Sequence, residues 1–427
     1  MPAKPHCESH DEKMKRTTTA VVLVVLATAI ACASPARPTA PRAVPVLVAG
    51  TSGNYPPLSE WNDQRIDGFA PALLTAFARD DSVELRWRPF RWPELSSDLQ
   101  AGRFTIAVDG ITVTPERSIA GRFTVPIARG GAVLLLRRPP WARAAQDVVG
   151  LDRPELRVAV NRGGYLERVA RTRLPAADVL ALADNAGVRD ALARGEVDAA
   201  MTNTFEAPRW SAGLADVEAI GPLTSDVTAL WVRSDEEDLA ERVDAWLLGE
   251  EESGRLGALR RRWLGAAAGP VTATPVAAVL AATAERLSLM PFVAAAKQRA
   301  GAAIEDSAQE ERVLAASAAA VRRAAEKAAL PVPAADVVNA FFQAQIEAAK
   351  SLQARGDPPQ KPAWSLEQDL RPAIARITGR LAWLLVRIQA RKPDPAIVPL
   401  AHDMLGGTGL DPRRIDAIAS AIGAFAR

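Results

Sequence analysis

One stretch of the sequence combines residues that could bind a carboxylate next to a buried strand. Residues 104–108 form an apolar run that predicts a strand, and Asp109-Gly110 follows as a turn. Thr114 then stands before a proline and a glutamate, which is the pattern of a helix N-cap with proline at the first helical position. Arg117 lies in the first turn of that helix. Free N–H groups and a guanidinium suit a carboxylate, although an ordinary strand-to-helix connection with a surface arginine has the same pattern.

Arg286 and Lys297 form a second basic group, with the spacing of one helix face. Eleven positions separate them, or about three helical turns, which places both on one side of a predicted helix. Cations that face the inside of an Ala-rich bundle are costly unless an anion accompanies them. The pair therefore indicates an anionic ligand, whereas Arg322, Arg323 and Lys327 are typical of a solvated basic face.

The composition excludes several other kinds of chemistry. The 427 residues carry 52 Lys and Arg against 50 Asp and Glu, a net charge of +2, without the basic half expected of a nucleic-acid binder. The histidines are His6, His10 and His402, and the cysteines are Cys7 and Cys32. The body of the chain therefore lacks the residues for a Ser-His-Asp triad or a Cys/His zinc site, and we expect neither a metal nor a cofactor.

Residues 1–33 have the pattern of an export signal. A basic segment beginning at Met14 precedes the apolar run 20–30, which is too short to span a membrane and resembles a signal peptide that starts at Met14. Cleavage after Ala31 would leave Cys32 first, so a lipid anchor on Cys32 is the alternative to plain secretion. We prefer secretion because Ala29 stands where a lipidation signal has leucine. Residues 34–45 are a predicted Pro/Ala-rich tether, and we expect the protein in the periplasm.

Residues 46–264 show an alternation of strands and helices. Strands are predicted at 46–50, 83–87 and 104–108, and a similar series begins again at 156–160. This β-α-β-α-β order predicts parallel sheets with ligand groups at the carboxyl ends of the strands.

Residues 276–427 follow a small, uncharged linker at 265–275 and are Ala-rich. Their apolar spacing predicts an all-α bundle with helices at 276–299, 305–329, 336–355, 366–389 and 411–425. We expect the linker to permit many relative orientations of the two domains, and we expect no segment after the signal to span a membrane.

The motifs of the first domain resemble the amino-acid-binding type of periplasmic solute-binding proteins. The order is a strand with Gly50-Thr-x-Gly-x-Tyr-x-Pro57, then Gly68-Phe, then Arg-Trp92-Pro, then Asp109-Gly-Ile-Thr-x-Thr-x-Glu-Arg117. The resemblance implies the two-lobed α/β fold of type II. It also implies that Arg117 holds the α-carboxylate of a ligand, helped by Thr112 and by backbone groups such as that of Gly110.

Three features resemble a catalytic branch of that family, the exported cyclohexadienyl (prephenate/arogenate) dehydratases. They are Trp92-Pro, Asn161-x-Gly-Gly164 and Met201-Thr-Asn203-Thr-Phe-Glu206. The resemblance implies that Glu206 protonates the departing hydroxyl of prephenate and that Trp92, Asn161, Gly164 and Asn203 contact the substrate.

Glu206 would need a raised pKa to act as an acid at neutral pH, which burial in a closing cleft would supply. A solvated carboxylate at a helix start is the alternative. The sequence departs from the family pattern at Asn203 and Asn54, where the family has Asp, and at Tyr165-Leu166, where it has Thr-Asn. These departures leave open whether the substrate is prephenate or arogenate.

Four segments of the bundle resemble the secreted, gamma-class chorismate mutases: residues 284–287, 294–297, 304–307 and 345–353. The resemblance implies that Arg286 and Lys297 bind the carboxylate and ether-oxygen region of chorismate and that Gln353 hydrogen-bonds the ether oxygen. It further implies a carboxylate-binding role for Arg380 and a homodimer.

The mutase resemblance has one serious departure. Asp306 is retained, but Gln309 stands where the family has arginine, and Arg312 one turn further on is the candidate replacement. The implied reaction is a pericyclic rearrangement that needs no nucleophile, so the bundle contributes by selecting a compact conformer and placing fixed positive charge.

The two resemblances imply one route, because prephenate is the product of one reaction and the substrate of the other. We therefore predict an exported enzyme that converts chorismate to phenylpyruvate in phenylalanine biosynthesis. The main alternative is a binding protein for an amino acid or aromatic acid with a helical accessory module, and a further one makes one domain an inactive regulator of the other. Glu206 discriminates, because a receptor needs Arg117 but has no use for a buried acid.

Overall fold

The computed structural model describes residues 44–137, 147–214, 216–268, 273–355, 359, 362–389 and 395–426, together with residues 1 and 3. The predicted signal run, Cys32 and most of the tether lie outside the described residues. Residues Val46–Arg427 form one compact unit.

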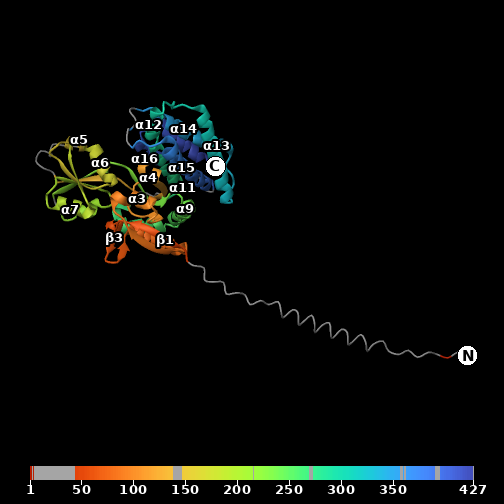
Figure 1. The fold of residues 1–427 in the computed structure, drawn as a ribbon, viewed down its shortest axis with the longest axis horizontal. Helices are drawn as coiled ribbons and strands as arrows, with labels where there is room; N and C mark the ends of the chain where they lie inside the picture. The colour runs from red at the N-terminus through yellow and green to blue at the C-terminus, as the bar shows by residue number, and fades with distance from the viewer. Residues whose placement is uncertain are drawn as a thin grey trace. The chain divides into compact units, whose positions relative to one another are not determined.

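A five-stranded sheet in the order β5-β1-β6-β13-β7 forms the first lobe (Figure 1). The strand β1 pairs in parallel with β5 and β6, as the predicted β-α-β order requires, whereas β13 returns antiparallel between β6 and β7. A small sheet, β2-β3-β4, follows the first glycine turn. The elements of this lobe are β1 (Val46–Thr51), β2 (Asn54–Tyr55), β3 (Ser59–Asn62), β4 (Arg65–Asp67), α2 (Phe69–Asp80), β5 (Glu84–Pro89), α3 (Leu95–Gln100), β6 (Ile106–Ala107), α4 (Pro115–Ala120), β7 (Gly121–Gly130), β13 (Asp226–Arg233), α9 (Glu237–Glu252) and α10 (Arg255–Leu264).

A second five-stranded sheet, in the order β10-β9-β11-β8-β12, forms the second lobe. The chain enters this lobe at Gly131, between β7 and β8, and leaves it between β12 and β13. Its elements are β8 (Ala132–Arg137), α5 (Val148–Leu151), β9 (Arg157–Asn161), α6 (Tyr165–Arg173), β10 (Asp178–Leu182), α7 (Asn185–Ala193), β11 (Ala199–Asn203), α8 (Ala207–Ser211) and β12 (Val217–Ile220). Two lobes joined by crossing segments confirm the predicted two-lobed α/β fold.

The C-terminal part is helical, as predicted, with two differences. The helix predicted at 276–299 is divided, because Pro291 lacks the N–H that would continue the first helix and lies at the start of a new one. A further helix over residues 397–405 was missed, since it is short and carries Pro399 in its first turn. The helices are α11 (Pro275–Ser288), α12 (Met290–Arg299), α13 (Ser307–Lys327), α14 (Ala335–Gln353), α15 (Arg371–Ile388), α16 (Ile397–Leu405) and α17 (Pro412–Ala424).

The bundle packs directly on the first lobe, which overturns the expectation of two freely oriented domains. Helix α11 contacts β7 and α4, and α15 contacts α4. One hydrophobic core cluster includes buried residues of both parts, among them Phe123 and Val243 of the lobe and Leu280 and Leu381 of the bundle. Sequence composition identifies a linker, but it does not report contacts between residues so far apart in the chain.

One stretch, Pro275–Arg299, is long and apolar enough to cross a membrane by length and composition, with a mean hydropathy of 1.5 in its best window. The expectation that no later segment would pass this test is therefore wrong. However, 72% of that window is buried inside the fold, which accounts for its apolar composition equally well.

Candidate active sites

A cleft between the two lobes brings together the residues predicted to bind a substrate in the first domain. The first lobe contributes Trp92, Gly110, Thr112 and Arg117, and the second lobe contributes Asn161, Gly164 and Asn203. The cleft has an empty volume of about 550 Å³. The sequence analysis did not assign the nine other lining residues to the site: Tyr55, Gly130, Gly131, Tyr165, Leu166, Asn185, Phe205, Asp226 and Thr228.

Arg117 supplies a buried positive charge to the cleft. The Thr114 hydroxyl caps α4 by accepting a bond from the Arg117 N–H at 3.4 Å. The Arg117 Nη1 donates to the carbonyl of Thr112 at 2.9 Å, and its Cζ lies 6.0 Å from the ring centre of Trp92. Burial lowers the pKa of Arg117 to about 10. Within the part of the chain that the structure describes, Arg117 makes no ion pair, so an anionic ligand would relieve the cost of its burial.

Glu206 is fully buried behind the cleft, immediately after β11. The Thr202 hydroxyl donates to its Oε2 at 2.9 Å and the Asn185 amide donates to its Oε1 at 3.1 Å. Burial raises the pKa of Glu206 well above its ordinary value, and these two donors only partly oppose that effect. The alternative of a solvated carboxylate is therefore excluded. Asn185 lines the cleft and connects it to the carboxyl group.

Tyr55 crosses from the first lobe to the second and contacts the amide of Asn203. The Asn203 Oδ1 accepts bonds from the backbone N–H groups of Phe205 at 2.8 Å and Glu206 at 3.1 Å, so it fixes the turn that carries the acid. Burial raises the pKa of Tyr55 well above its ordinary value, and the carboxyl group of Glu206 adds to this effect. The tyrosine stands inside the first glycine motif, where it could have been noticed.

Asp226 is a second, half-buried carboxyl group of the cleft that sequence reasoning missed. The Tyr165 hydroxyl donates to its Oδ1 at 2.8 Å, and the Thr224 hydroxyl donates to its Oδ2 at 2.9 Å. Burial raises the pKa of Asp226. Two further polar atoms, Trp92 Nε1 and Asn161 Oδ1, are buried without a protein partner among the described residues. Both are therefore candidates to contact a ligand.

In the bundle, Arg286 is a buried cation that has no carboxylate partner among the described residues. It lies on α11 with 5% of its surface exposed, and its Nη1 is 3.4 Å from Oε1 of Gln345. Gln345 is held in turn, because its Nε2 donates to the Thr283 hydroxyl at 2.7 Å. Burial alone lowers the pKa of Arg286 to about 10. The Arg286 Nε has no partner among the described residues, as expected of a group that awaits an anion.

Gln353 lies at the α11–α12 junction, where its Nε2 is 3.6 Å from the sulfur of Met290. The Gln353 Oε1 is buried without a partner among the described residues. Lys297, on the next helix, donates to the carbonyl of Ile304 at 2.8 Å. Burial lowers the pKa of Lys297, while the nearby carboxylate of Asp306 opposes that fall.

Gln309, where the family has arginine, contacts both Asp306 and Arg312. Asp306 caps α13 by accepting from the Gln309 N–H at 2.9 Å. The Gln309 Oε1 accepts from Arg312, at 3.2 Å from Nε and 2.9 Å from Nη2. Arg312 therefore lies against the position where the family has arginine, although its own side chain is exposed.

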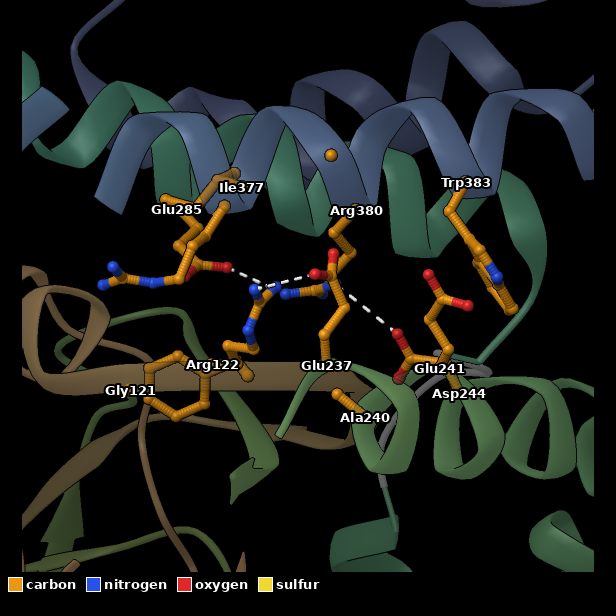
Figure 2. Close-up of a pocket in the computed structure, with 13 residues that line it drawn as sticks. Gly121, Arg122, Glu237, Ala240, Glu241, Asp244, Glu285, Ile377, Arg380 and Trp383 are labelled. Atoms are coloured by element: carbon orange, nitrogen blue, oxygen red, sulfur yellow. Dashed lines mark hydrogen bonds and ion pairs between the residues drawn. The ribbon is translucent and has the colours of Figure 1, made fainter. Parts of the chain in front are cut away.

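Arg380 does not have the role predicted for it. It lies on α15 at the contact with the first lobe. Its Nη1 is 2.9 Å from Oε2 of Glu285 on α11, and its Nε is 3.9 Å from Oδ2 of Asp244 on α9 of the lobe (Figure 2). These carboxylates already compensate its charge. Glu285 and Arg286 are neighbours on α11 that point to different sides of the helix, one toward Arg380 and one toward Gln345. Arg380 is therefore an arginine of the domain contact.

Comparison with known proteins agrees with the two-part organisation. Residues 47–266 match the bacterial extracellular solute-binding proteins, family 3, and residues 277–354 match chorismate mutase type II. Cyclohexadienyl dehydratase of Pseudomonas aeruginosa is 30% identical over 222 residues, which cover 51% of this chain and 82% of that protein. The L-cystine-binding protein of Escherichia coli K12 is 24% identical over 52% of this chain and 83% of that protein.

Among solved structures, an ancestral amino acid-binding protein described as a precursor of cyclohexadienyl dehydratase is 28% identical, with a TM-score of 0.48. The similarity covers 51% of this chain and 95% of that one. The family match and the identity to the dehydratase lead to one conclusion. The chain belongs to the bacterial extracellular solute-binding proteins of family 3 and continues into a domain of the chorismate mutase type II family.

Proposed function

We propose that this chain is a bifunctional enzyme that rearranges chorismate to prephenate in the bundle and converts prephenate to phenylpyruvate in the cleft. The observation that carries the second activity is Glu206, a fully buried carboxyl group with a raised pKa behind a cleft that also contains Arg117. A binding protein needs the arginine but gains nothing from an acid held in its protonated form.

The dehydration follows from the chemistry of these two groups. Arg117 holds one carboxylate of prephenate, and the protonated Glu206 donates its proton to the ring hydroxyl, which departs as water. The bond between the ring and its other carboxylate breaks at the same time, carbon dioxide leaves, and the electron pair of that bond makes the ring aromatic. Trp92 and Asn161 offer the unpartnered Nε1 and Oδ1 atoms to orient the substrate.

The rearrangement in the bundle needs no proton transfer. One carbon–oxygen bond of chorismate breaks while one carbon–carbon bond forms, and the ether oxygen gains negative charge on the way. Arg286 supports this role because it is a buried cation without a carboxylate partner among the described residues, and Gln353 contributes a buried Oε1 atom that likewise has no partner there. Lys297 and Asp306 complete the proposed site, with Gln309 and Arg312 in place of the family's arginine.

One coupled assay tests both activities. The chain from Ser34 onward is given chorismate, and phenylpyruvate is measured by its absorbance in base, for the parent protein, Glu206→Gln and Arg286→Ala. We expect phenylpyruvate from the parent, accumulation of prephenate with Glu206→Gln, and unchanged chorismate with Arg286→Ala. Each variant is the control for the other, since each should retain the reaction of the domain that it leaves intact.

Other results would contradict the proposal in identifiable ways. If chorismate is untouched but added prephenate is converted, the bundle is not an active mutase, and Gln309 is the first residue to change to Arg. If neither substrate reacts, the binding-protein alternative replaces the proposal.

We also propose that the protein is exported to the periplasm to supply phenylalanine biosynthesis, with residues 1–33 as a signal peptide and a homodimer formed through the bundle. The family of extracellular solute-binding proteins supports export. Cell fractionation and the intact mass of the mature protein test export and separate secretion from lipidation at Cys32. Light scattering tests the dimer.

A further inference from the structure

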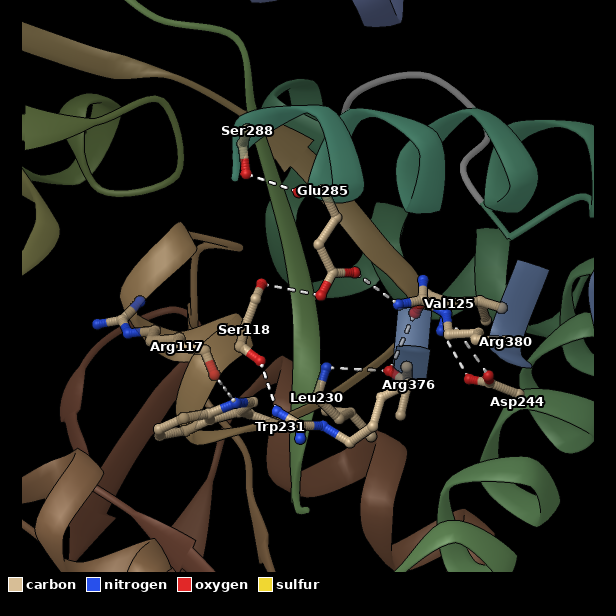
Figure 3. A network of polar contacts seen from close by, with 11 residues as sticks. Arg117, Ser118, Val125, Leu230, Trp231, Asp244, Glu285, Ser288, Arg376 and Arg380 are labelled. Atoms are coloured by element: carbon tan, nitrogen blue, oxygen red, sulfur yellow. Dashed lines mark hydrogen bonds and ion pairs between the residues drawn. The ribbon is translucent and has the colours of Figure 1, made fainter. Parts of the chain in front are cut away.

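The short helix that carries Arg117 is held in place by the bundle. The Ser118 hydroxyl, 1% exposed, donates to Oε1 of Glu285 at 2.8 Å (Figure 3). The Arg376 Nη2 donates to the carbonyls of Ser118 at 3.0 Å and Ile119 at 2.8 Å. Helix α4 has only six residues, too few to be stable by its own hydrogen bonds. Its C-terminal half therefore depends on partners outside the helix.

These contacts lie next to the proposed ligand-binding arginines of both domains. Ser118 follows Arg117 in the chain, and Glu285 precedes Arg286, so one buried hydrogen bond joins the neighbours of the two arginines. The second oxygen of Glu285 accepts from Arg380 at 2.9 Å, which keeps the carboxylate fixed. From the lobe side, the Trp231 Nε1 donates to the carbonyl of Arg117 at 3.1 Å.

We propose that Glu285 and Arg376 of the bundle are positioning residues for Arg117, so that the mutase domain completes the carboxylate-binding site of the cleft. Neither touches the cleft; both act through the backbone and the hydroxyl group of α4. Loss of these contacts lets α4 shift and moves the guanidinium, which weakens the hold on the substrate carboxylate. Glu206 lies in the second lobe, so proton transfer is affected far less than binding. The choice of prephenate as the ligand rests on the function proposed above.

The test compares four variants of the full mature chain. Ser118→Ala and Arg376→Met remove the contacts, and Ser118→Thr keeps the hydroxyl group. Lys327→Ala is the matched control, because Lys327 pairs with Asp238 and Glu241 across the same domain contact without touching α4. The readouts are kcat and KM for prephenate, kcat/KM for chorismate, and the melting temperature.

We expect Ser118→Ala and Arg376→Met to raise the KM for prephenate about fivefold or more, in the range of typical coupling between sites, while kcat changes much less. Ser118→Thr should restore the parent KM, Lys327→Ala should match the parent, and kcat/KM for chorismate should stay close to the parent in Ser118→Ala. An unchanged KM in both contact-removing variants overturns the inference. So does a parallel loss of both activities and of melting temperature in all variants, which would indicate a merely structural contact.

A second measurement tests the inference without relying on turnover. If the parent does not convert prephenate, the proposed function is wrong, but the contact between the bundle and α4 can still be tested. Hydrogen–deuterium exchange of the peptide spanning residues 112–123 reports directly on α4. We expect faster exchange in Ser118→Ala and Arg376→Met, and parent-like exchange in Ser118→Thr and Lys327→Ala. Equal exchange in all five proteins would show that the bundle does not hold the helix.

Discussion

Two arginines of the bundle should respond in opposite ways to the same substitution. Arg286 and Arg380 were both predicted to bind a substrate carboxylate, but the structure gives Arg380 a carboxylate partner in Glu285, whereas Arg286 has none in the described part of the chain. We predict that Arg286→Met stabilises the fold and abolishes the mutase activity. Arg380→Met should destabilise the fold. Methionine replaces the packing of the aliphatic stem without the charge.

The stabilisation expected for Arg286→Met can be worked out from the pKa of Arg286. Burial lowers the pKa of Arg286 from its ordinary value to about 10, and such a difference corresponds to about 3 kcal/mol. A depressed pKa means that the protonated side chain opposes folding at every pH well below 10, so the cost is fully present at neutral pH. The hydrogen bond to Gln345 is long, at 3.4 Å, and losing it lowers the free energy of unfolding by roughly 1 kcal/mol. The net gain in the free energy of unfolding should be about 2 kcal/mol.

The expectation for Arg380→Met comes from the carboxylate that it would leave behind. Glu285 has a side chain only 3% exposed, and it would lose its cationic partner. Breaking one half of a buried ion pair costs about 3–5 kcal/mol. Thermal unfolding of the two variants beside the parent measures both signs, and the disappearance of chorismate measures activity. A loss of about a hundredfold or more in kcat is expected for Arg286→Met, as for removal of one preorganised donor.

Two results would refute this reasoning. A clear fall in the melting temperature of Arg286→Met would show that Arg286 is a structural residue whose partners already compensate its charge. Loss of mutase activity in a well-folded Arg380→Met, with activity retained in Arg286→Met, would reverse the assignment of the two arginines.

Three further predictions concern charge in the cleft and at the domain contact. Because Glu206 must carry a proton, the kcat for prephenate should be level at low pH and fall as the pH rises through the raised pKa of Glu206; a rate that rises with pH would contradict its role. Arg117→Met should raise the KM for prephenate about a hundredfold and leave chorismate turnover unchanged, and equal losses in both reactions would argue against the cleft assignment. Burial raises the pKa of Asp244 to about 7, so its contribution to stability is full below about pH 4 and is lost as the pH rises through 7. Asp244→Asn should therefore melt like the parent at pH 4 and at a higher temperature at pH 8; the opposite order at pH 8 would show that ionised Asp244 is stabilising.

Features set by short stretches of sequence were predictable. The strand, the turn and the capped helix around Arg117 depend on neighbours within a few positions, and the structure has all three. Residues whose environment comes from distant partners were missed. Asp226 is held by a hydrogen bond from Tyr165, sixty-one positions away, and no local pattern marks it. Arg380 is a second example, because its carboxylate partners Glu285 and Asp244 are distant in the chain, and the match to chorismate mutase type II ends at residue 354, before Arg380.

The contact between the two domains nevertheless has a signature in the sequence. Glu237, Glu241 and Asp244 lie at positions i, i+4 and i+7 of α9, which places them on one face of that helix. Arg376, Arg380 and Arg387 lie at i, i+4 and i+11 of α15 and form a basic face. Alone, each face is typical of a solvated helix surface.

In the structure these two faces meet. Side chains of α9 and α15 line the same cavity, with an empty volume of about 470 Å³ (Figure 2). The carboxylates of Glu241 and Asp244 oppose the fall in the pKa of Arg387 that burial causes, so the charges are close enough to interact. One helix therefore carries an acidic face and another a basic face. Together, such a pair of helices indicates a docking surface within one chain. Their arginines belong to that surface, while a buried arginine without an acidic counterpart, such as Arg286, remains available to a ligand.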